Sequence, residues 1–287
     1  MIETYYARRI LMRLGGEIFE KYTNAEEWAL AVRKKGYKAA YAPVDYTVSD
    51  SEVESYKKAA KEHDIVIGEV GVWNNVLDQD AKKREENLAV AVKKLALAEE
   101  LEAKCCVNIA GSYSSERWDG PHPDNFSQKA YDQVVQSVQY LIDTVKPQKT
   151  FYTFEPLAWM LPDTIEVHLE LIKDIDRKAF GVHFDPVNMM YTPKIYYANG
   201  EFLKEAIRKF GKHIKSCHVK DLYMEDVFTL FIRECKPGEG VFDYPTFISE
   251  IDKLDPEMPV FVEHMHTEQE YDDAANYVRR KIAEVYR

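Results

Sequence analysis

The sequence predicts a (β/α)8 TIM barrel, in which helices surround a ring of eight parallel strands and the active site lies at the C-terminal ends of the strands. Short apolar runs rich in β-branched and aromatic residues alternate with helical stretches along the 287 residues. This alternation favours a parallel sheet covered by helices. An open doubly wound sheet would usually place a Gly-rich phosphate loop after its first strand. The residues Arg13-Leu-Gly-Gly-Glu17 lack that spacing.

The first half of the chain provides four strands, expected over Arg9 to Leu14, Tyr37 to Val44, Ile65 to Val72 and Cys105 to Ala110. Helices are expected between them over about Asn24 to Lys35, from Ser49 onward, and over about Asp80 to Glu102. Thr23 with Glu26 predicts a capping box at the start of the first helix, and Gly36 predicts its end. Ser49 with Glu52 predicts a second capping box.

The second half continues the alternation, with helices expected over Ser127 to Val145, Asp163 to Ile175 and Gly200 to Phe210, then after Tyr244 and after Thr267. Thr267 with Glu270 predicts a third capping box. Two connections are long, Gly111 to Phe126 and Pro186 to Asn199. Long loops in compact domains are often functional, so we expect both to lie over the barrel mouth and to set substrate choice.

Composition narrows the class of protein. The net charge of −11 argues against a nucleic-acid partner and against an anionic membrane surface. The four cysteines form no C-x-x-C pair, which is the usage of a reducing compartment. The N-terminal residues MIETYYARRI contain no apolar signal region, and no stretch reaches transmembrane length, so a cytoplasmic location is expected. Without a Pro/Gly/Ser-rich linker, residues 1–287 are expected to form one domain.

Four apolar runs in the second half end at a metal-binding or acid–base side chain. The runs end at Glu155, Asp185, His218 and Glu263. Because the C-terminal strand ends of a barrel open onto one face, these four side chains are expected to form a one-metal site. Three carboxylates and one imidazole suit Mn²⁺, Mg²⁺ or Co²⁺, and Zn²⁺ is compatible. Taken singly, Glu155 and Asp185 also read as turn carboxylates before proline, and His218 as a core histidine.

A second group of side chains is expected to contact substrate: His183, Lys220, Asn108, Trp118, His122 and Arg233. His183 and Lys220 stand two residues from proposed ligands, on the same face of their strands. Asn108 ends the fourth strand. Other readings stay open, including a salt bridge for Lys220, a loop-capping amide for Asn108 and loop packing for Trp118. Glu69, in the third strand, reads equally as functional or as one partner of an ion pair.

The sequence resembles the xylose-isomerase-like barrel superfamily of sugar-phosphate isomerases and epimerases along essentially its whole length. The motifs that carry this resemblance are Glu155, His183-Phe-Asp185-Pro-Val-Asn188, Cys217-His-Val-Lys-Asp221, Pro237-Gly-Glu-Gly-Val-Phe-Asp-Tyr244 and Val262-Glu-His264. The resemblance implies that Glu155, Asp185, His218 and Glu263 bind one divalent metal, and that the two glutamates act as acid–base groups. Many ketose 3-epimerases place a substrate-binding His where this chain has Asn188, so Asn188 joins the expected substrate contacts.

The resemblance implies a metal-dependent isomerase or epimerase of carbohydrate metabolism, acting on a ketose or related polyhydroxy carbonyl compound through a metal-stabilised enediolate. Mn²⁺ is the first expectation for the metal. A lyase on the same scaffold, either an inosose-type dehydratase or a C-glycoside-cleaving enzyme, is the main alternative, followed by a non-catalytic sugar-binding relative. An apurinic nuclease would need further His ligands, and the first four strands contain none. The expected partner is a small carbohydrate, and the sequence leaves a homo-oligomer open.

Overall fold

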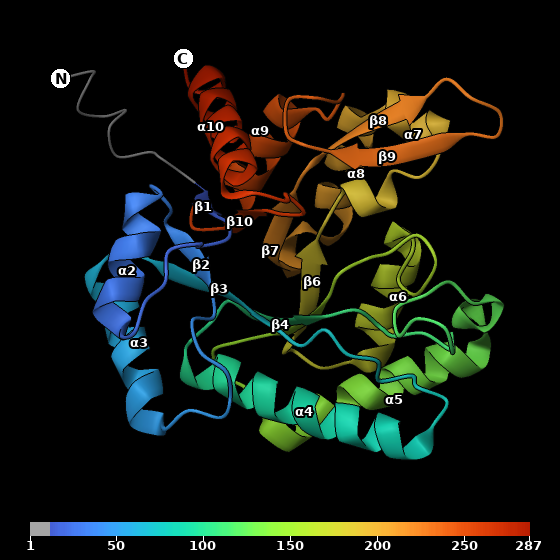
Figure 1. Ribbon diagram of the computed structural model, residues 1–287. Helices are drawn as coiled ribbons and strands as arrows, with labels where there is room; N and C mark the ends of the chain where they lie inside the picture. The colour runs from blue at the N-terminus through green and yellow to red at the C-terminus, as the bar shows by residue number, and fades with distance from the viewer. Residues whose placement is uncertain (1–11) are drawn as a thin grey trace.

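The computed structural model describes residues 12–287, and its centre is a parallel eight-stranded barrel (Figure 1). The strands are β1 (Arg13–Gly15), β2 (Ala39–Tyr41), β3 (Val66–Gly71), β4 (Cys105–Asn108), β5 (Tyr152–Phe154), β6 (Phe180–Phe184), β7 (Ile214–Val219) and β10 (Pro259–Val262). They follow the order β1-β10-β7-β6-β5-β4-β3-β2. The backbone N–H of Lys38 donates to the carbonyl of Leu14 at 2.9 Å and links β2 to β1, so the ring is nearly closed. The predicted fold class is confirmed.

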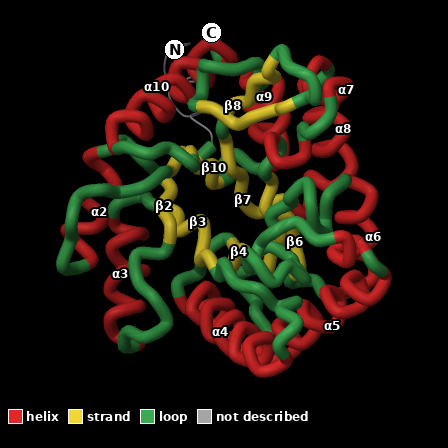
Figure 2. Tube along the Cα trace, turned by 45° about the vertical axis from the view of Figure 1, so that its right-hand side comes forward, coloured by secondary structure: helices red, strands yellow, loops and turns green. Residues whose placement is uncertain are grey.

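Helices surround this ring, as Figure 2 shows. The longer ones are α2 (Ala25–Lys34), α3 (Asp50–Glu62), α4 (Ala81–Glu100), α5 (Gln128–Val145), α6 (Ile165–Ile175), α8 (Asn199–Phe210), α9 (Tyr244–Leu254) and α10 (Glu268–Val285). Short helical turns are η1 (Pro123–Phe126), η2 (Val187–Met189), α7 (Pro193–Tyr197) and η3 (Gly211–His213). Within residues 12–287, no helix is long and apolar enough to span a membrane.

The N-termini of α2, α3 and α10 can be compared with the three predicted capping boxes. Thr267 and Glu270 form both halves of the box at α10, and the Ser49 side chain accepts from the Glu52 backbone N–H at α3. At α2 the prediction was wrong by one residue, because Asn24 is the N-cap and accepts from the Glu27 N–H. Glu27 bonds back to the Thr23 backbone at 2.8 Å. Glu26 instead contacts His63, the C-cap residue of α3, at 3.0 Å.

Two further segments differ from the predicted elements. The predicted first strand began at residue 9, but residues 9–11 lie outside the described part of the chain. Between β7 and α9 the sequence predicted only a connection, whereas the structure has an antiparallel hairpin, β8 (Asp221–Glu225) with β9 (Phe231–Cys235). Leu222 on β8 is fully buried, whereas the residues of β9 are half-buried or exposed. We call β8, β9 and their connecting residues 221–235 the hairpin.

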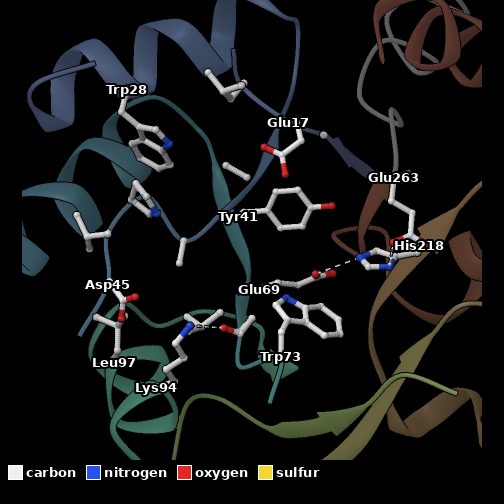
Figure 3. Close-up of a pocket in the computed structure, with 18 of the residues that line it drawn as sticks. Glu17, Trp28, Tyr41, Asp45, Glu69, Trp73, Lys94, Leu97, His218 and Glu263 are labelled. Atoms are coloured by element: carbon white, nitrogen blue, oxygen red, sulfur yellow. Dashed lines mark hydrogen bonds and ion pairs between the residues drawn. The ribbon is translucent and has the colours of Figure 1, made fainter. Parts of the chain in front are cut away.

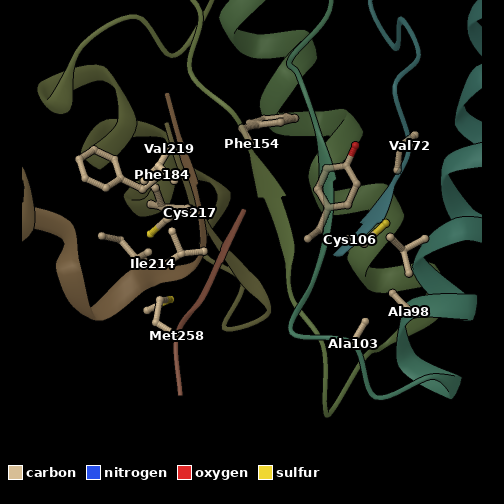
Figure 4. Packing of buried hydrophobic residues seen from close by; sticks show 14 of the residues in the cluster. Val72, Ala98, Ala103, Cys106, Phe154, Phe184, Ile214, Cys217, Val219 and Met258 are labelled. Carbon is tan, nitrogen blue, oxygen red and sulfur yellow. The ribbon is translucent and has the colours of Figure 1, made fainter. Parts of the chain in front are cut away.

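The core lies in two places, between the sheet and the helices and inside the barrel. Between sheet and helices, Phe154, Phe184, Cys217 and their neighbours form a continuous apolar cluster (Figure 4). All four cysteines are free. Inside the barrel, Phe261 fills the centre, and a Cβ on either Gly15 or Gly68 would lie 2.5 Å from its ring. Tyr41 stacks on Phe261 with ring centroids 4.4 Å apart. The floor beneath the barrel mouth is therefore aromatic and tightly packed.

Candidate metal centre and active site

Four side chains at the C-terminal ends of β5, β6, β7 and β10 converge at the barrel mouth. They are Glu155, Asp185, His218 and Glu263, and all four are buried. One potential ligand atom of each lies within 4.8 Å of those of the other three. Parallel barrel strands end at the same face and alternate residues point inward, so an inward-facing residue at or next to the end of a strand points into the mouth. The structure thus brings together the residues that the sequence predicted to share a site.

The Nδ1 edge of the His218 ring faces the carboxylates of Glu155 and Glu263. His218 Nδ1 lies 2.8 Å from Glu263 Oε2 and 3.1 Å from Glu155 Oε1. Lys220 binds the remaining side of the cluster, with Nζ 2.8 Å from Asp185 Oδ2 and 2.5 Å from Glu263 Oε1. Its side chain is 1% exposed, so this ammonium is a buried part of the cluster.

The pKa shifts show how strongly the carboxylates dominate the local charge. Burial disfavours the imidazolium of His218, but the carboxylates of Glu263 and Glu69 outweigh burial and raise its pKa well above the usual value. Burial also opposes ionisation of Glu263, yet His218 and Lys220 hold the pKa of that carboxyl well below its ordinary value. Burial raises the pKa of Asp185 well above its usual value, and the Lys220 ammonium offsets this only in part. His218 and Lys220 therefore do not fully balance the negative charge of the buried carboxylates in this cluster.

The donor set fits a divalent ion. Oxygen ligands from Glu155, Asp185 and Glu263 with one imidazole nitrogen are suited to Mn²⁺, Mg²⁺ or Co²⁺. His218 would coordinate through Nδ1, the nitrogen that faces Glu155 and Glu263. A divalent cation would also add positive charge at these carboxylates, beside the Lys220 ammonium and the imidazoles of His218 and His264, whose Nε2 lies 3.5 Å from Glu263 Oε2.

A second layer beneath the mouth holds His218 in place. Glu69 Oε2, on β3, lies 3.2 Å from His218 Nε2, on the ring side opposite the proposed metal (Figure 3). Glu69 Oε1 lies 3.3 Å from His183 Nδ1, which contacts the Ser216 hydroxyl at 2.6 Å. Burial, and then the positive charge of His218, lower the pKa of His183 to about 3, so its ring is neutral. A carboxylate behind a metal-binding histidine fixes the tautomer and orientation of the ring.

The predicted substrate contacts fall into two groups. Asn188 donates to Glu155 Oε1 at 3.3 Å, and Trp118 and Arg233 line the pocket above the carboxylates. Lys220 lies at the centre, but it is paired with Asp185 and Glu263. The remaining predicted contacts are held by other parts of the protein. His183 is buried beneath the mouth, as described above. Asn108 accepts from the Asn74 N–H at 3.2 Å and donates to the Tyr152 hydroxyl.

His122 also points away from the mouth. Its Nδ1 accepts from the Asp124 N–H at 3.2 Å, and its ring packs near Tyr113 with centroids 6.4 Å apart. It therefore stabilises the turn that precedes α5, whereas Trp118 of the same loop faces the pocket.

The pocket above the centre has two lobes that share Trp73, Glu155 and His264. The first, which we call the polar lobe, has a volume of about 670 Å³ and lies over the ends of β1, β2 and β3. Glu17, Tyr41 and Asp45 line it, and Figure 3 shows Tyr41 facing the same space as Glu69 and His218. The second, the apolar lobe, has a volume of about 510 Å³.

The apolar lobe lies beneath the two long loops and the hairpin. Trp118 comes from residues 111–126, Tyr191 from residues 186–199, and Leu230 and Ile232 from the hairpin. The prediction that both long loops lie over the mouth is therefore confirmed. Their role in substrate choice stays a prediction.

Sequence reasoning missed Trp73, and it predicted Arg233 as a substrate contact without predicting the hairpin that carries it. Trp73 has a φ of +49° and lines both lobes, and a Cβ on Gly71 would lie 2.1 Å from its indole nitrogen. On the hairpin, Glu234 reaches His264 Nδ1 at 2.9 Å and Lys220 Nζ at 3.2 Å, which ties this segment to the metal centre. The Gly-Val-Trp run after β3 was the available signal for Trp73, since glycine leaves room for a large neighbour.

A family comparison identifies the scaffold. The model of the xylose isomerase-like TIM barrel family matches residues 30–281. The chain belongs to this family. No curated protein matches the sequence.

Solved structures agree over nearly the whole chain. A xylose isomerase-like TIM barrel protein from Mycobacterium smegmatis, in complex with magnesium, has 16% identity and a TM-score of 0.67, covering 98% of this chain and 99% of its own. The 3-keto-D-glucoside 4-epimerase from E. coli has 18% identity and a TM-score of 0.68, covering 94% and 99%. A probable 3-DHS dehydratase from Bacillus anthracis has 12% identity and a TM-score of 0.67, covering 94% and 98%. At these identities the likeness shows the shared fold.

Proposed function

We propose that the protein is a divalent-metal-dependent sugar isomerase or epimerase that acts on a ketose or a related polyhydroxy carbonyl compound. The observation that carries this proposal is the pair of buried glutamates, Glu155 and Glu263, which both lie within 3.1 Å of His218 Nδ1. The family, and a structural relative that is a 3-keto-D-glucoside 4-epimerase, support the reaction class. We propose Mn²⁺ as the preferred metal, held by these glutamates with Asp185 and His218.

The reaction begins with removal of a proton from the carbon beside a carbonyl group. A bound divalent ion would act as a Lewis acid toward that carbonyl, a contribution of about several kcal/mol. Glu155 and Glu263 come from different strands, so one carboxylate can accept the proton from one side of a substrate held between them while the other returns a proton from the opposite side. Asn188 orients Glu155, and Lys220 orients Glu263. Return to the same carbon is epimerisation, and return to the neighbouring carbon is isomerisation.

A lyase is the second candidate, because a relative of the same fold is a probable 3-DHS dehydratase. The first half-reaction is shared, since both reactions remove a proton next to a carbonyl. The two differ in whether the second glutamate returns the proton to carbon or to a departing oxygen. Recovered substrate that contains solvent deuterium identifies the shared step, and the product then separates the classes.

The test is proton exchange in deuterated water with metal-loaded protein and a panel of ketoses, inososes and keto-glycosides. Glu155→Gln and Glu263→Gln are nearly isosteric but cannot carry a proton, so each should lose about 10²- to 10⁴-fold in turnover. Each variant should still exchange deuterium into one epimer, because one carboxylate remains. Metal content is measured in parallel, and Glu62→Gln, on the exposed side of α3, is the control. Near wild-type turnover in both metal-replete variants would show that the two glutamates are not the acid–base pair.

A further inference from the structure

The two lobes of the pocket differ in chemistry although they open onto the same metal centre. The polar lobe is lined by the carboxylates of Glu17, Asp45 and Glu69 and by the hydroxyl of Tyr41. Among the described residues, the structure records no hydrogen bond for the Glu17 carboxylate or the Tyr41 hydroxyl. These groups are therefore available to the hydroxyl groups of a ligand, as a polyhydroxy ring requires.

The apolar lobe offers the opposite surface. Its walls include Ile109, Trp118, Leu157, Met190, Leu230 and Ile232. The charged side chains at its edge are already paired within the protein. Arg117 binds Asp119 at 2.6 Å, Arg233 binds Glu225, and Glu234 binds Lys220 and His264. What the lobe presents to a ligand is mainly aliphatic and aromatic carbon.

Aromatic side chains of this lobe stand unusually open to solvent. Trp73, Trp118 and Tyr191 are 42%, 41% and 39% exposed, and all three line the lobe. Apolar surface gathered in a concave site usually marks a ligand-binding surface. Flat aromatic faces bind a planar apolar group best, because stacked rings gain contact beyond the area they bury.

The wall of the apolar lobe is fixed in place rather than free to collapse. The indole N–H of Trp159 donates to the Asp119 carbonyl at 2.7 Å, and Asn125 donates to the Trp159 carbonyl at 3.0 Å. These bonds tie the loop that carries Trp118 to the connection after β5. A wall held in this way keeps the lobe preformed for a ligand.

We infer that the substrate is a keto-glycoside or similar keto conjugate, with a polyhydroxy ring at the metal centre and a planar apolar group, such as an aryl aglycone, in the apolar lobe. This deepens the proposed function and rests on it, since that function places the sugar portion between Glu155 and Glu263. Both glutamate-bearing strand ends border the polar lobe, and Glu155 also borders the apolar lobe, so a ligand can reach from one lobe into the other across the centre.

The test is calorimetric binding of 2-naphthyl and methyl D-glucopyranosides, each in both anomers, to metal-loaded full-length protein. For at least one anomer, the naphthyl glycoside should bind about tenfold more tightly than the methyl glycoside. The reason is that its aromatic rings are transferred from water into the apolar lobe. Trp118→Ala and Leu230→Gln should remove most of this preference. Both positions are exposed, so neither change should unfold the protein. Phe126→Ala is the matched control, being 50% exposed in the same loop but outside both lobes, and it should keep the preference.

Equal affinities for naphthyl and methyl glycosides in both anomers, or no binding of either, would overturn the inference. A preference that survives both Trp118→Ala and Leu230→Gln would do the same. The proposed function is judged separately by deuterium exchange. A naphthyl preference in a protein that exchanges no substrate proton would support the aglycone site and count against the isomerase. Exchange without a naphthyl preference would leave the isomerase standing and remove the aglycone site.

Discussion

The two sides of the barrel mouth are built for different tasks. On β5, β6, β7 and β10, ionisable side chains are buried and paired with one another, as in the contacts of Lys220 with Asp185 and Glu263. After β1 and at the end of β2, Glu17 and Tyr41 face the polar lobe without such partners among the described residues. The charged side chains of β5, β6, β7 and β10 are therefore held in fixed ion pairs. Glu17 and Tyr41, by contrast, stay available to form hydrogen bonds with a ligand. Glu69 on β3 belongs to both, since it borders the polar lobe and contacts His218.

The largest expected effect compares two lysines, one on each side. Lys220→Met should destabilise the metal-free protein by about 3–5 kcal/mol, because the Asp185 and Glu263 carboxylates would stay buried without their cation. Lys94→Met should cost only about 1 kcal/mol, because the Lys94 ammonium donates to a neutral carbonyl, that of Gly71, at 2.8 Å. Urea unfolding of both variants measures the difference. Equal losses would mean that Lys220 does not balance buried charge.

Metal should affect the stability of Lys220→Met and Lys94→Met differently. A ligand that binds only the folded state raises the free energy of unfolding. Mn²⁺ should therefore restore part of the stability lost in Lys220→Met, since it supplies positive charge at the same carboxylates. It should stabilise Lys94→Met only as much as it stabilises wild type.

A smaller effect is expected at Glu69, where the two sides meet. Glu69→Gln should weaken metal binding about 10- to 100-fold, because the carboxylate behind His218 Nε2 would be lost. Glu17→Gln, in the same lobe but without a contact to His218 among the described residues, should leave metal affinity unchanged and weaken sugar binding. Competition with a chelator gives the metal affinities. If Glu69→Gln binds metal as tightly as wild type, His218 does not need this support.

The smallest expected effect contrasts two buried histidines. Carboxylates raise the pKa of His218, whereas burial, assisted by His213, lowers the pKa of His168 on α6 to about 3. The unfolded chain binds a proton at His168 below about pH 6.5 and the folded protein does not until about pH 3, so stability falls as pH falls through this window. His168→Leu should lessen that fall by about 1.3 kcal/mol between pH 7 and pH 5.5, because the full slope of about 1.4 kcal/mol per pH unit is reached only below about pH 6.5. Urea unfolding at pH 7 and pH 5.5 provides the measurement, and an unchanged pH dependence would contradict it.

Much of the site was predictable from the sequence because its key residues end strands. Glu155 and Glu263 each follow an apolar run, and the barrel geometry then fixes where they meet. His183 was harder to place, because a residue two positions before a strand end shares its face but lies about 6–7 Å lower in the barrel. Lys220, two positions beyond His218, lies higher and reaches the carboxylates. Strand alternation predicts the face but not the layer.

Trp73 and the hairpin, which line the apolar lobe, could not be placed from the sequence. Trp73 depends on a left-handed backbone conformation beside Gly71, and the hairpin depends on packing of Leu222 and Ile232 against loops distant in the sequence. Neither feature has a local motif as clear as a carboxylate at the end of an apolar run. Side chains set by tertiary contacts can be placed only once the loops around them are known.

The central claim is that the four converging side chains form one metal site. Elemental analysis and titration of Mn²⁺-loaded protein should give about one divalent ion per chain. Asp185→Ala and His218→Ala should lose most of that ion, and Asp45→Ala in the polar lobe should retain it. Wild-type protein that holds no metal after loading, or Asp185→Ala and His218→Ala variants that hold as much as wild type, would contradict the account.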